Sequence, residues 1–378
     1  MQEFIYYNPN GLDFPLNEEI LVTNNIEDVK EQDFLISNTS DVNAEVNADE
    51  IDFYLKNTKD PVATQIENIY KLYEIAANKY DLAQDISYSQ EVSKQLLLIT
   101  NSQDSYNDFL ACIKPEDFEL FFIKEEMVKS ISGMIGNLNV VVDDEGKDVD
   151  LNVSQIVWFD AKKEGMKQSG CFDPLESSIE EVVSQLKENI NEYSYKKFTT
   201  YDSSICQYHE RREEICSKCE EVCPTVAITK DDKTKTLGFS QIDCHGCGGC
   251  ISVCPSGAMD YAPSNRNSIY EMSKFYKNTH PLVIPEKMNM KDLSADLKEN
   301  VLPFSIEGEK FLDESTFLTL LQLSGSQVIF YSDFISKGSG DAIRIVKDIY
   351  QKKYGKDAII VAMDEKELEE ALKTVSFV

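Results

Sequence analysis

The chain has 378 residues, 42% of them hydrophobic, and a formal net charge of −30 at pH 7. Such a charge repels phosphate backbones and anionic lipid, which argues against nucleic acid and membrane surfaces as partners. No apolar run of about 18 residues is present that could cross a bilayer, and Met1–Gly11 has no basic segment followed by an apolar run. We therefore expect no membrane insertion and a cytoplasmic location.

The first 60 residues are strongly acidic, with 14 Asp and Glu residues against three Lys. A solvated surface explains such a run, and acidic side chains beside a docking face would also steer a basic partner. Residues 1–60 are therefore expected to form an acidic, partly disordered segment.

Residues 61–200 alternate between helical and extended patterns. Asp60 and Pro61 open a helical pattern with one apolar face. Further along the chain, we expect a helix at 106–113 and strands at 95–100, 118–123, 138–142 and 153–159. Asp173 as a cap and Pro174 in the first turn predict the start of another helix. Together these patterns predict an N-terminal α/β domain.

One cysteine pattern occurs twice in the middle of the chain, displaced by 31 residues. The shared pattern is Cys-x-x-Cys-x-x-x-Cys-Pro, and its two copies are Cys216, Cys219, Cys223, Pro224 and Cys247, Cys250, Cys254, Pro255. Cys244 precedes the second copy and completes the run that holds cubane iron–sulfur clusters. Cysteines three residues apart can wrap three thiolates around one face of such a cluster, so the fourth ligand must come from elsewhere.

This repeat resembles the bacterial-type ferredoxin domain that carries two [4Fe-4S] clusters, and the resemblance covers residues 201–262. It implies that the last cysteine of each run ligates the cluster of the other run. Carried over position by position, it assigns four ligands to one cluster, here called cluster 2: Cys223, Cys244, Cys247 and Cys250. Cluster 1 receives three ligands: Cys216, Cys219 and Cys254.

The fourth ligand of cluster 1 departs from the family pattern. The repeat places it at Glu213, 31 residues before Cys244. Cys206 is the expected substitute, because thiolate is the usual ligand and the longer loop to Cys216 adds only about 1 kcal/mol or less of closure free energy. Glu213 as an oxygen ligand and a three-iron cluster are the alternatives. His209 lies in the same loop, where a surface or supporting role fits it better than ligation.

Structural zinc is the alternative interpretation of the cysteines, because paired Cys-x-x-Cys units also build four-thiolate sites. Zinc would leave cysteines over, whereas two clusters account for eight cysteines and both Cys-Pro junctions. Disulfides are disfavoured by the dense thiols and the missing secretory signal. Cys112 and Cys171 stand alone and are interpreted as ordinary thiols.

A second resemblance concerns the segment Ser132–Val142. It is similar to a short segment that precedes ferredoxin domains in the heterodisulfide reductase A subunit and in some formate-dehydrogenase-associated ferredoxins. A glycine-bounded turn that enters a strand explains the same letters.

Residues 263–378 alternate again between strands and helices. The expected strands are 282–284, 302–306, 328–331 and 358–362, and the expected helices are 290–297, 314–323 and 341–354, with a last helix from 364. Asp364 with Glu367 predicts a capping box, and Gly355 predicts the end of the preceding helix. This alternation predicts a C-terminal α/β domain with a mainly parallel, doubly wound sheet.

Two features of this C-terminal region remain open in the sequence. The strand 328–331 leads through Lys337-Gly-Ser-Gly into a helix start, which could cradle an anion, although a plain loop capped by Asp341 is the better interpretation. The final residues, Thr374–Val378, follow the last helix like an unfinished strand, which suggests a piece of a longer protein.

The sequence thus predicts a multidomain α/β and α+β protein with a small two-cluster ferredoxin domain between two α/β domains. Its expected function is electron transfer through two [4Fe-4S] clusters, with no catalytic residues of its own. The alternative is an iron–sulfur subunit of a formate dehydrogenase, hydrogenase or heterodisulfide-reductase-like enzyme, and the remote alternative is a zinc-stabilised interaction protein. The expected partners are redox proteins with a basic docking surface.

Overall fold

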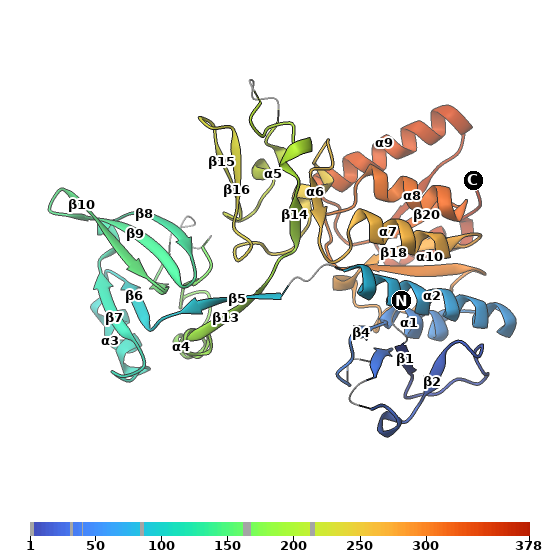
Figure 1. The fold of residues 1–378 in the computed structure, drawn as a ribbon, viewed down its shortest axis with the longest axis horizontal. Helices are drawn as coiled ribbons and strands as arrows, with labels where there is room; N and C mark the ends of the chain where they lie inside the picture. Colours follow the sequence, from blue (N-terminus) through green and yellow to red (C-terminus); the bar gives the residue numbers. More distant parts are fainter. Residues whose placement is uncertain (1–3, 31–32, 40, 84–86, 162–167, 212–215) are drawn as a thin grey trace. The chain divides into compact units, whose positions relative to one another are not determined.

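A computed structural model describes residues 4–30, 33–39, 41–83, 87–161, 168–211 and 216–378 (Figure 1). Contacts divide the chain into two compact units. The first unit consists of Met1–Gln84, Thr199–Cys206 and Cys247–Val378, and the second consists of Asp85–Phe198 and Gln207–Gly246. The protein is thus a mixed α/β molecule, as the sequence predicts, while the predicted domain boundaries stay a prediction.

The C-terminal part of the first unit is built on a parallel four-stranded sheet in the order β19-β18-β20-β21. Its strands are β18 (His280–Pro285), β19 (Val301–Ile306), β20 (Val328–Tyr331) and β21 (Ile359–Ala362). Its helices are α7 (Arg266–Ser273), α8 (Glu314–Ser324), α9 (Lys337–Tyr354) and α10 (Glu365–Thr374). Later strands lie on both sides of β18, so the chain winds in both directions from it, which confirms the predicted parallel architecture.

The N-terminal part of the first unit contains a second parallel sheet, in the order β2-β1-β3-β4. Its elements are β1 (Phe4–Tyr7), β2 (Leu21–Thr23), β3 (Phe34–Ser37), β4 (Val46–Asn47), α1 (Asp49–Asn57) and α2 (Val62–Leu82). The Tyr73 hydroxyl on α2 donates to the Phe4 carbonyl at 2.7 Å. Helix α2 also contacts α7, and α1 contacts β19, so these residues share one packed body with the C-terminal sheet.

The second unit contains a parallel sheet in the order β12-β11-β6-β7 and an antiparallel sheet in the order β10-β9-β8. The strands of these sheets are β6 (Gln95–Ile99), β7 (Glu119–Ile123), β8 (Val128–Met134), β9 (Asn137–Asp144), β10 (Lys147–Val153), β11 (Gln155–Trp158) and β12 (Cys171–Phe172). Helices α3 (Gln103–Ala111) and α4 (Ile179–Glu188) belong to the same unit, and β5 (Ser87–Val92) pairs with β13 (Asn191–Lys196). Leu97, Leu138 and Ile156 are fully buried in a core that both sheets share.

The remaining elements lie near the cysteines in the sequence. Strand β14 (Thr199–Tyr201) pairs with β17 (Met259–Tyr261) in the first unit, and β15 (Ile228–Asp231) pairs with β16 (Thr236–Phe239) in the second. Two helical turns, α5 (Lys218–Glu221) and α6 (Gly249–Ser252), each carry one cysteine.

One predicted helix is absent from the structure, and three predicted element boundaries are wrong. No helix forms over 290–297, because the N–H groups of Ala295 and Leu297 donate to the side chain and carbonyl of Asn57 instead. Helix α4 begins at Ile179 with a Ser178 capping box, and the Asp173 carboxylate accepts N–H groups from the 160–161 turn.

The other two boundary differences concern the strand predicted at 153–159 and the start of helix α9. The strand expected at 153–159 breaks at Ser154, whose N–H donates to the Gln95 carbonyl, so β10 ends before β11 begins. Helix α9 begins at Lys337 with Ser336 as its cap, so Asp341 lies inside the helix and the Lys337-Gly-Ser-Gly segment forms its first turn. Gly355 ends this helix in the left-handed conformation, as predicted.

Two further observations concern the last residues and the helices. Phe377 forms an isolated antiparallel bridge with Ser326, so the final residues pair with the chain without making a full strand. Within the described ranges, every helix is too short or too polar to cross a bilayer.

Candidate metal centre

The two cysteine copies fold into the same local structure. Ser217 and Gly248, 31 residues apart, precede α5 and α6, and their carbonyls accept N–H groups from Glu220 at 2.9 Å and from Ile251 at 3.0 Å. The turns end alike, with φ −96° and ψ −6° at Val222 against φ −97° and ψ −5° at Val253. The sequence repeat is therefore a structural repeat, which extends beyond the cysteines themselves.

Each turn places its cysteines in the same way. Cys219 lies in α5 and Cys250 in α6, and both are buried. Cys223 and Cys254 follow the turns, and their N–H groups donate to the carbonyls of Glu220 at 3.2 Å and Ile251 at 3.1 Å. The ten cysteines of the chain offer the soft sulfur ligands that an iron–sulfur cluster needs.

Hydroxyl groups lie beside the last cysteine of each copy, a feature that the sequence interpretation missed. The Thr225 Oγ1 atom is 3.6 Å from the Cys223 sulfur, and the Ser256 Oγ atom is 3.8 Å from the Cys254 sulfur. Both hydroxyls stand two residues after their cysteine and 31 residues apart, so the repeat itself contains the signal that finds them. Hydrogen bonds to cysteine sulfurs tune cluster potentials, and these hydroxyls are placed to make them.

The backbone segments that precede Cys206 and Cys244 have the same structure. Cys206 follows β14 by five residues, and Cys244 follows β16 by five residues. Both cysteine N–H groups close a turn at 3.2 Å, Cys206 on the Ser203 carbonyl and Cys244 on the Gln241 carbonyl.

The backbone at the start of these two turns is held in the same way. The Asp202 N–H donates to the Ala258 carbonyl at 2.9 Å, and the Ser240 N–H donates to the Ala227 carbonyl at 2.8 Å. Ala227 and Ala258 are themselves related by the 31-residue repeat. Cys206 thus ends the same kind of backbone turn as Cys244, although Cys206 is buried and Cys244 is half-buried.

The loop after Cys206 is anchored on the β15–β16 hairpin. Tyr208 is fully buried, and its hydroxyl donates to the Asp232 carboxylate at 2.8 Å. The Glu210 N–H donates to the Lys235 carbonyl at 2.9 Å. His209 Nε2 lies 3.9 Å from a Glu210 carboxylate oxygen. Glu213 lies outside the described residues.

The eight predicted ligands are divided between the two units. Cys206, Cys247, Cys250 and Cys254 belong to the first unit, and Cys216, Cys219, Cys223 and Cys244 belong to the second. Across the described ranges, no group of three or more His, Cys, Asp or Glu side chains is gathered around a single-ion site. Outside the predicted set, Cys112 is half-buried, and Cys171 is buried with a thiol pKa raised to about 12 by desolvation and the nearby Asp243 charge.

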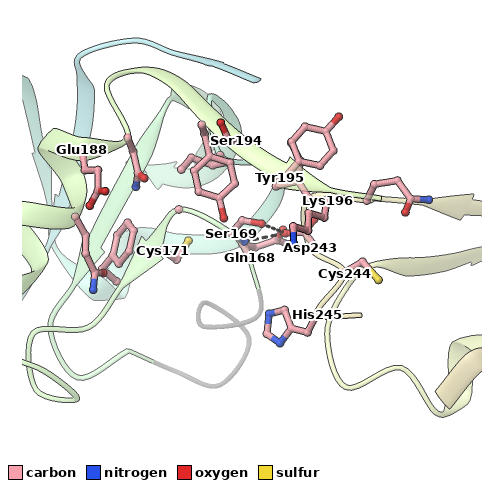
Figure 2. A pocket seen from close by; sticks show the side chains of 18 of the residues that line it. Gln168, Ser169, Cys171, Glu188, Ser194, Tyr195, Lys196, Asp243, Cys244 and His245 are labelled. Carbon is pink, nitrogen blue, oxygen red and sulfur yellow. Dashed lines mark hydrogen bonds between the residues drawn. The ribbon is translucent and has the colours of Figure 1, made fainter. Parts of the chain in front are cut away.

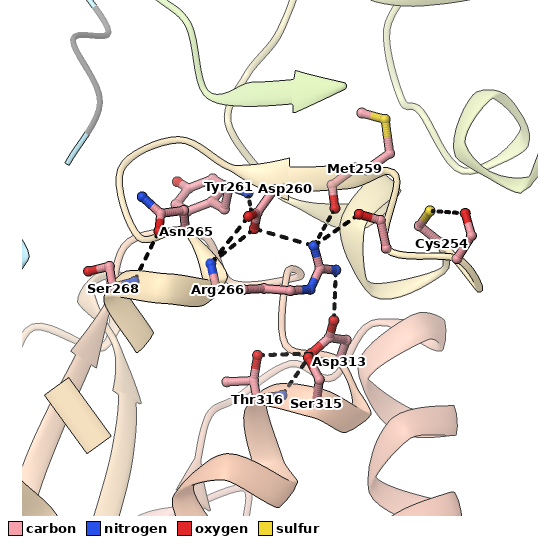
Figure 3. A network of polar contacts seen from close by, with 12 residues as sticks. Cys254, Met259, Asp260, Tyr261, Asn265, Arg266, Ser268, Asp313, Ser315 and Thr316 are labelled. Carbon is pink, nitrogen blue, oxygen red and sulfur yellow. Dashed lines mark hydrogen bonds and ion pairs between the residues drawn. The ribbon is translucent and has the colours of Figure 1, made fainter. Parts of the chain in front are cut away.

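An arginine secures the chain just after the second cysteine copy. Figure 3 shows the Arg266 guanidinium donating to the Met259 carbonyl at 2.8 Å and to the Asp313 carboxylate at 3.0 Å. Asp313 is the N-cap of α8, and it also accepts the Thr316 N–H. Burial raises the pKa of Asp260, which accepts the Arg266 N–H. Arg266 therefore ties β17 to the C-terminal α/β region.

Removing this arginine should destabilise the protein. Because Arg266→Met breaks charge-assisted hydrogen bonds, we expect the free energy of unfolding to fall by about 2 kcal/mol. Arg344→Met is the matched control: its ion pair with Asp341 is exposed, so the change should stay within about 0.5 kcal/mol. Denaturant unfolding of both variants checks this, and equal losses would contradict the role of Arg266.

Substitutions at the two residues that precede the helical turns should change the free energy of unfolding in opposite directions. Ser217 has φ 151° and Gly248 has φ 78°, conformations that favour glycine. Ser217→Gly should relieve strain and raise the free energy of unfolding by up to about 1 kcal/mol. A Cβ atom at Gly248 would lie 2.4 Å from the Phe311 Cβ. Gly248→Ser should therefore lower the free energy of unfolding by about 2–3 kcal/mol. Thermal unfolding that shows the same sign for both variants would refute this.

Comparison with known families agrees with this local structure. Residues 214–258 match the profile of a family described as a 4Fe-4S dicluster domain. The match supports a ferredoxin-type domain that binds [4Fe-4S] clusters and serves iron–sulfur electron transfer. It begins after Cys206 and covers a small part of the chain. No curated protein matches this sequence.

Proposed function

We propose that this protein transfers electrons through two [4Fe-4S] clusters held by eight cysteines. The observation that carries the proposal is the repeat of one cysteine-bearing turn, α5 and α6, inside the residues that match the dicluster family. Each cluster, when bound, accepts and donates one electron. The chain supplies the thiolates and, through Thr225 and Ser256, hydroxyl groups beside them.

The proposed ligand sets follow the crossed arrangement of the ferredoxin family. Cluster 1 takes Cys206, Cys216, Cys219 and Cys254, and cluster 2 takes Cys223, Cys244, Cys247 and Cys250. The matching backbone turns before Cys206 and Cys244 support Cys206 as the missing fourth ligand, because each cysteine follows its strand at the same distance through the same turn. The buried Tyr208, two residues after Cys206, holds this part of the chain on the β15–β16 hairpin.

The finer role is that of a ferredoxin-type carrier or of an electron-transfer subunit. The net charge of −30 supports a redox partner with a basic docking surface, since acidic surfaces steer basic partners. The closely spaced cysteines of the two sequence copies support a reducing, cytoplasmic location. The second candidate, a subunit of a formate dehydrogenase, hydrogenase or heterodisulfide-reductase-like enzyme, would be separated from a carrier by stable co-purification of a catalytic subunit.

A reductive titration of the anaerobically purified protein tests the proposal. Two clusters should take up about two electrons per chain, and the reduced protein should show the spin resonance of reduced [4Fe-4S] clusters. Reoxidation by an added electron acceptor should restore the starting absorption. A protein that takes up no electrons would rule out the proposed function.

A further inference from the structure

The second unit contains a pocket that the proposed electron transfer does not explain. Its volume is about 610 Å3, within the range of small-molecule sites. Figure 2 shows its walls, which come from β13, from the segment Gln168–Phe172 and from the segment Gln241–His245. Cys244, a proposed ligand of cluster 2, is among the lining residues.

The walls of this pocket are held in place by a buried carboxylate. Asp243 is 2% exposed and accepts the Ser169 N–H at 2.8 Å, the Ser169 hydroxyl and the Ser240 hydroxyl. Gly246, with φ 66°, lies against the Phe198 ring, where an added Cβ would come within 2.8 Å. Because these contacts fix both segments, the pocket is formed before any ligand arrives.

The lining suits a flat, polar-edged ring. Phe172, Tyr193 and Phe198 offer aromatic surfaces on which a planar ring can stack. Gln168, Gln185 and other side-chain amides offer donors and acceptors for its edge. The buried Oε1 atom of Gln168 has no hydrogen-bond partner among the described residues, so a ligand that donates an N–H would satisfy it. A quinone offers only carbonyl acceptors in its oxidised form, whereas a flavin has an N–H between two carbonyls.

One side of the pocket rim carries a lysine and a histidine. Lys196 and His245 lie on the same side of the view in Figure 2, and Glu188 lies across the pocket from them. A phosphate group would be attracted to the lysine and could accept hydrogen bonds from both side chains.

We propose that this pocket binds flavin mononucleotide, with the ring at Gln168 and Tyr193 and the phosphate at Lys196. Cys244 in the lining would then place the ring beside cluster 2, and this part of the inference rests on the proposed function. In the proposed electron transfer, reduced flavin gives up two electrons, one to each cluster. It releases two protons to solvent as it becomes oxidised flavin.

Titration of flavin mononucleotide into the anaerobic, cluster-loaded protein tests this inference. We expect saturable binding of one flavin per chain. Quenching of flavin fluorescence and equilibrium dialysis both measure this binding. Lys196→Ala and Gln168→Leu should each weaken binding about tenfold, which corresponds to 1.4 kcal/mol. Lys187→Ala is the matched control, because it removes the same charge from a lysine that pairs with Asp117 outside the pocket.

The outcomes separate this inference from the proposed function. Protein with its full iron content that binds no flavin, or that binds it equally in the Lys196→Ala and Lys187→Ala variants, overturns the pocket assignment. Binding of menadione in place of flavin, weakened by Gln168→Leu, overturns the choice of ligand. Protein without iron that still binds flavin in the expected variant order supports the pocket and refutes the electron-transfer proposal.

Discussion

Replacing Cys206 with alanine should remove about half of the iron, or leave a three-iron cluster, while the other cluster stays intact. The reason is that loss of a thiolate leaves one iron of cluster 1 without a protein ligand, whereas cluster 2 shares no cysteine with it. Iron and acid-labile sulfide analysis, with spin resonance of the oxidised protein, measures both outcomes.

Glu213→Ala is the matched control for Cys206→Ala. It removes the carboxylate at the position that the 31-residue repeat assigns to the missing ligand. If Cys206 is the ligand, the change alters little beyond local charge, and the iron content stays at the level of the unmodified protein. Intact clusters in the Cys206 variant together with a damaged cluster in the Glu213 variant would establish carboxylate ligation instead.

Replacing Cys223 with alanine should destroy cluster 2, although Cys223 stands in the same sequence copy as two ligands of cluster 1. The expected result follows from the crossed arrangement, in which the last cysteine of each run serves the other cluster. Iron analysis should again show a loss of about half, and double variants identify which cluster is lost.

Two double variants separate crossed from uncrossed ligation. Cys223→Ala combined with Cys247→Ala removes two ligands of the same cluster in the crossed arrangement, so about half of the iron should remain. Cys223→Ala combined with Cys219→Ala removes ligands of both clusters, so the iron should be lost. The reverse pattern would show that each sequence copy closes its own cluster.

The features predicted correctly from sequence are those that neighbouring residues determine. Cysteine spacing within one turn is local, so the repeat identified the cluster-binding segment that the family match supports. Strand β20 and the helix end at Gly355 were likewise predicted from an apolar run and from a left-handed glycine.

Several of the features that were missed depend on contacts between distant residues, whereas the Ser178 and Ser336 helix caps are local. Asn57 takes the backbone donors that a helix at 290–297 would need, and nothing near residue 290 indicates this. The first turn of α9 packs so closely on α6 that a Cβ at Gly338 would lie 2.2 Å from the Ser252 hydroxyl. The hydrogen bonds from Ser169 to Asp243, which shape the pocket, also join segments that are far apart in the sequence.

The loop after Cys206 has one feature that the sequence predicted and one that it did not. The sequence indicated a longer connection to Cys216, and chain-closure entropy allowed it. The hydrogen bond from Tyr208 to Asp232 holds the start of that loop on the β15–β16 hairpin, which spacing alone did not reveal.

Metal and sulfide analysis of anaerobically purified protein tests the central claim most directly. Two [4Fe-4S] clusters per chain predict about eight irons and about eight acid-labile sulfides. Zinc bound without acid-labile sulfide would contradict the claim, because it would assign the cysteines to structural metal sites and not to electron transfer.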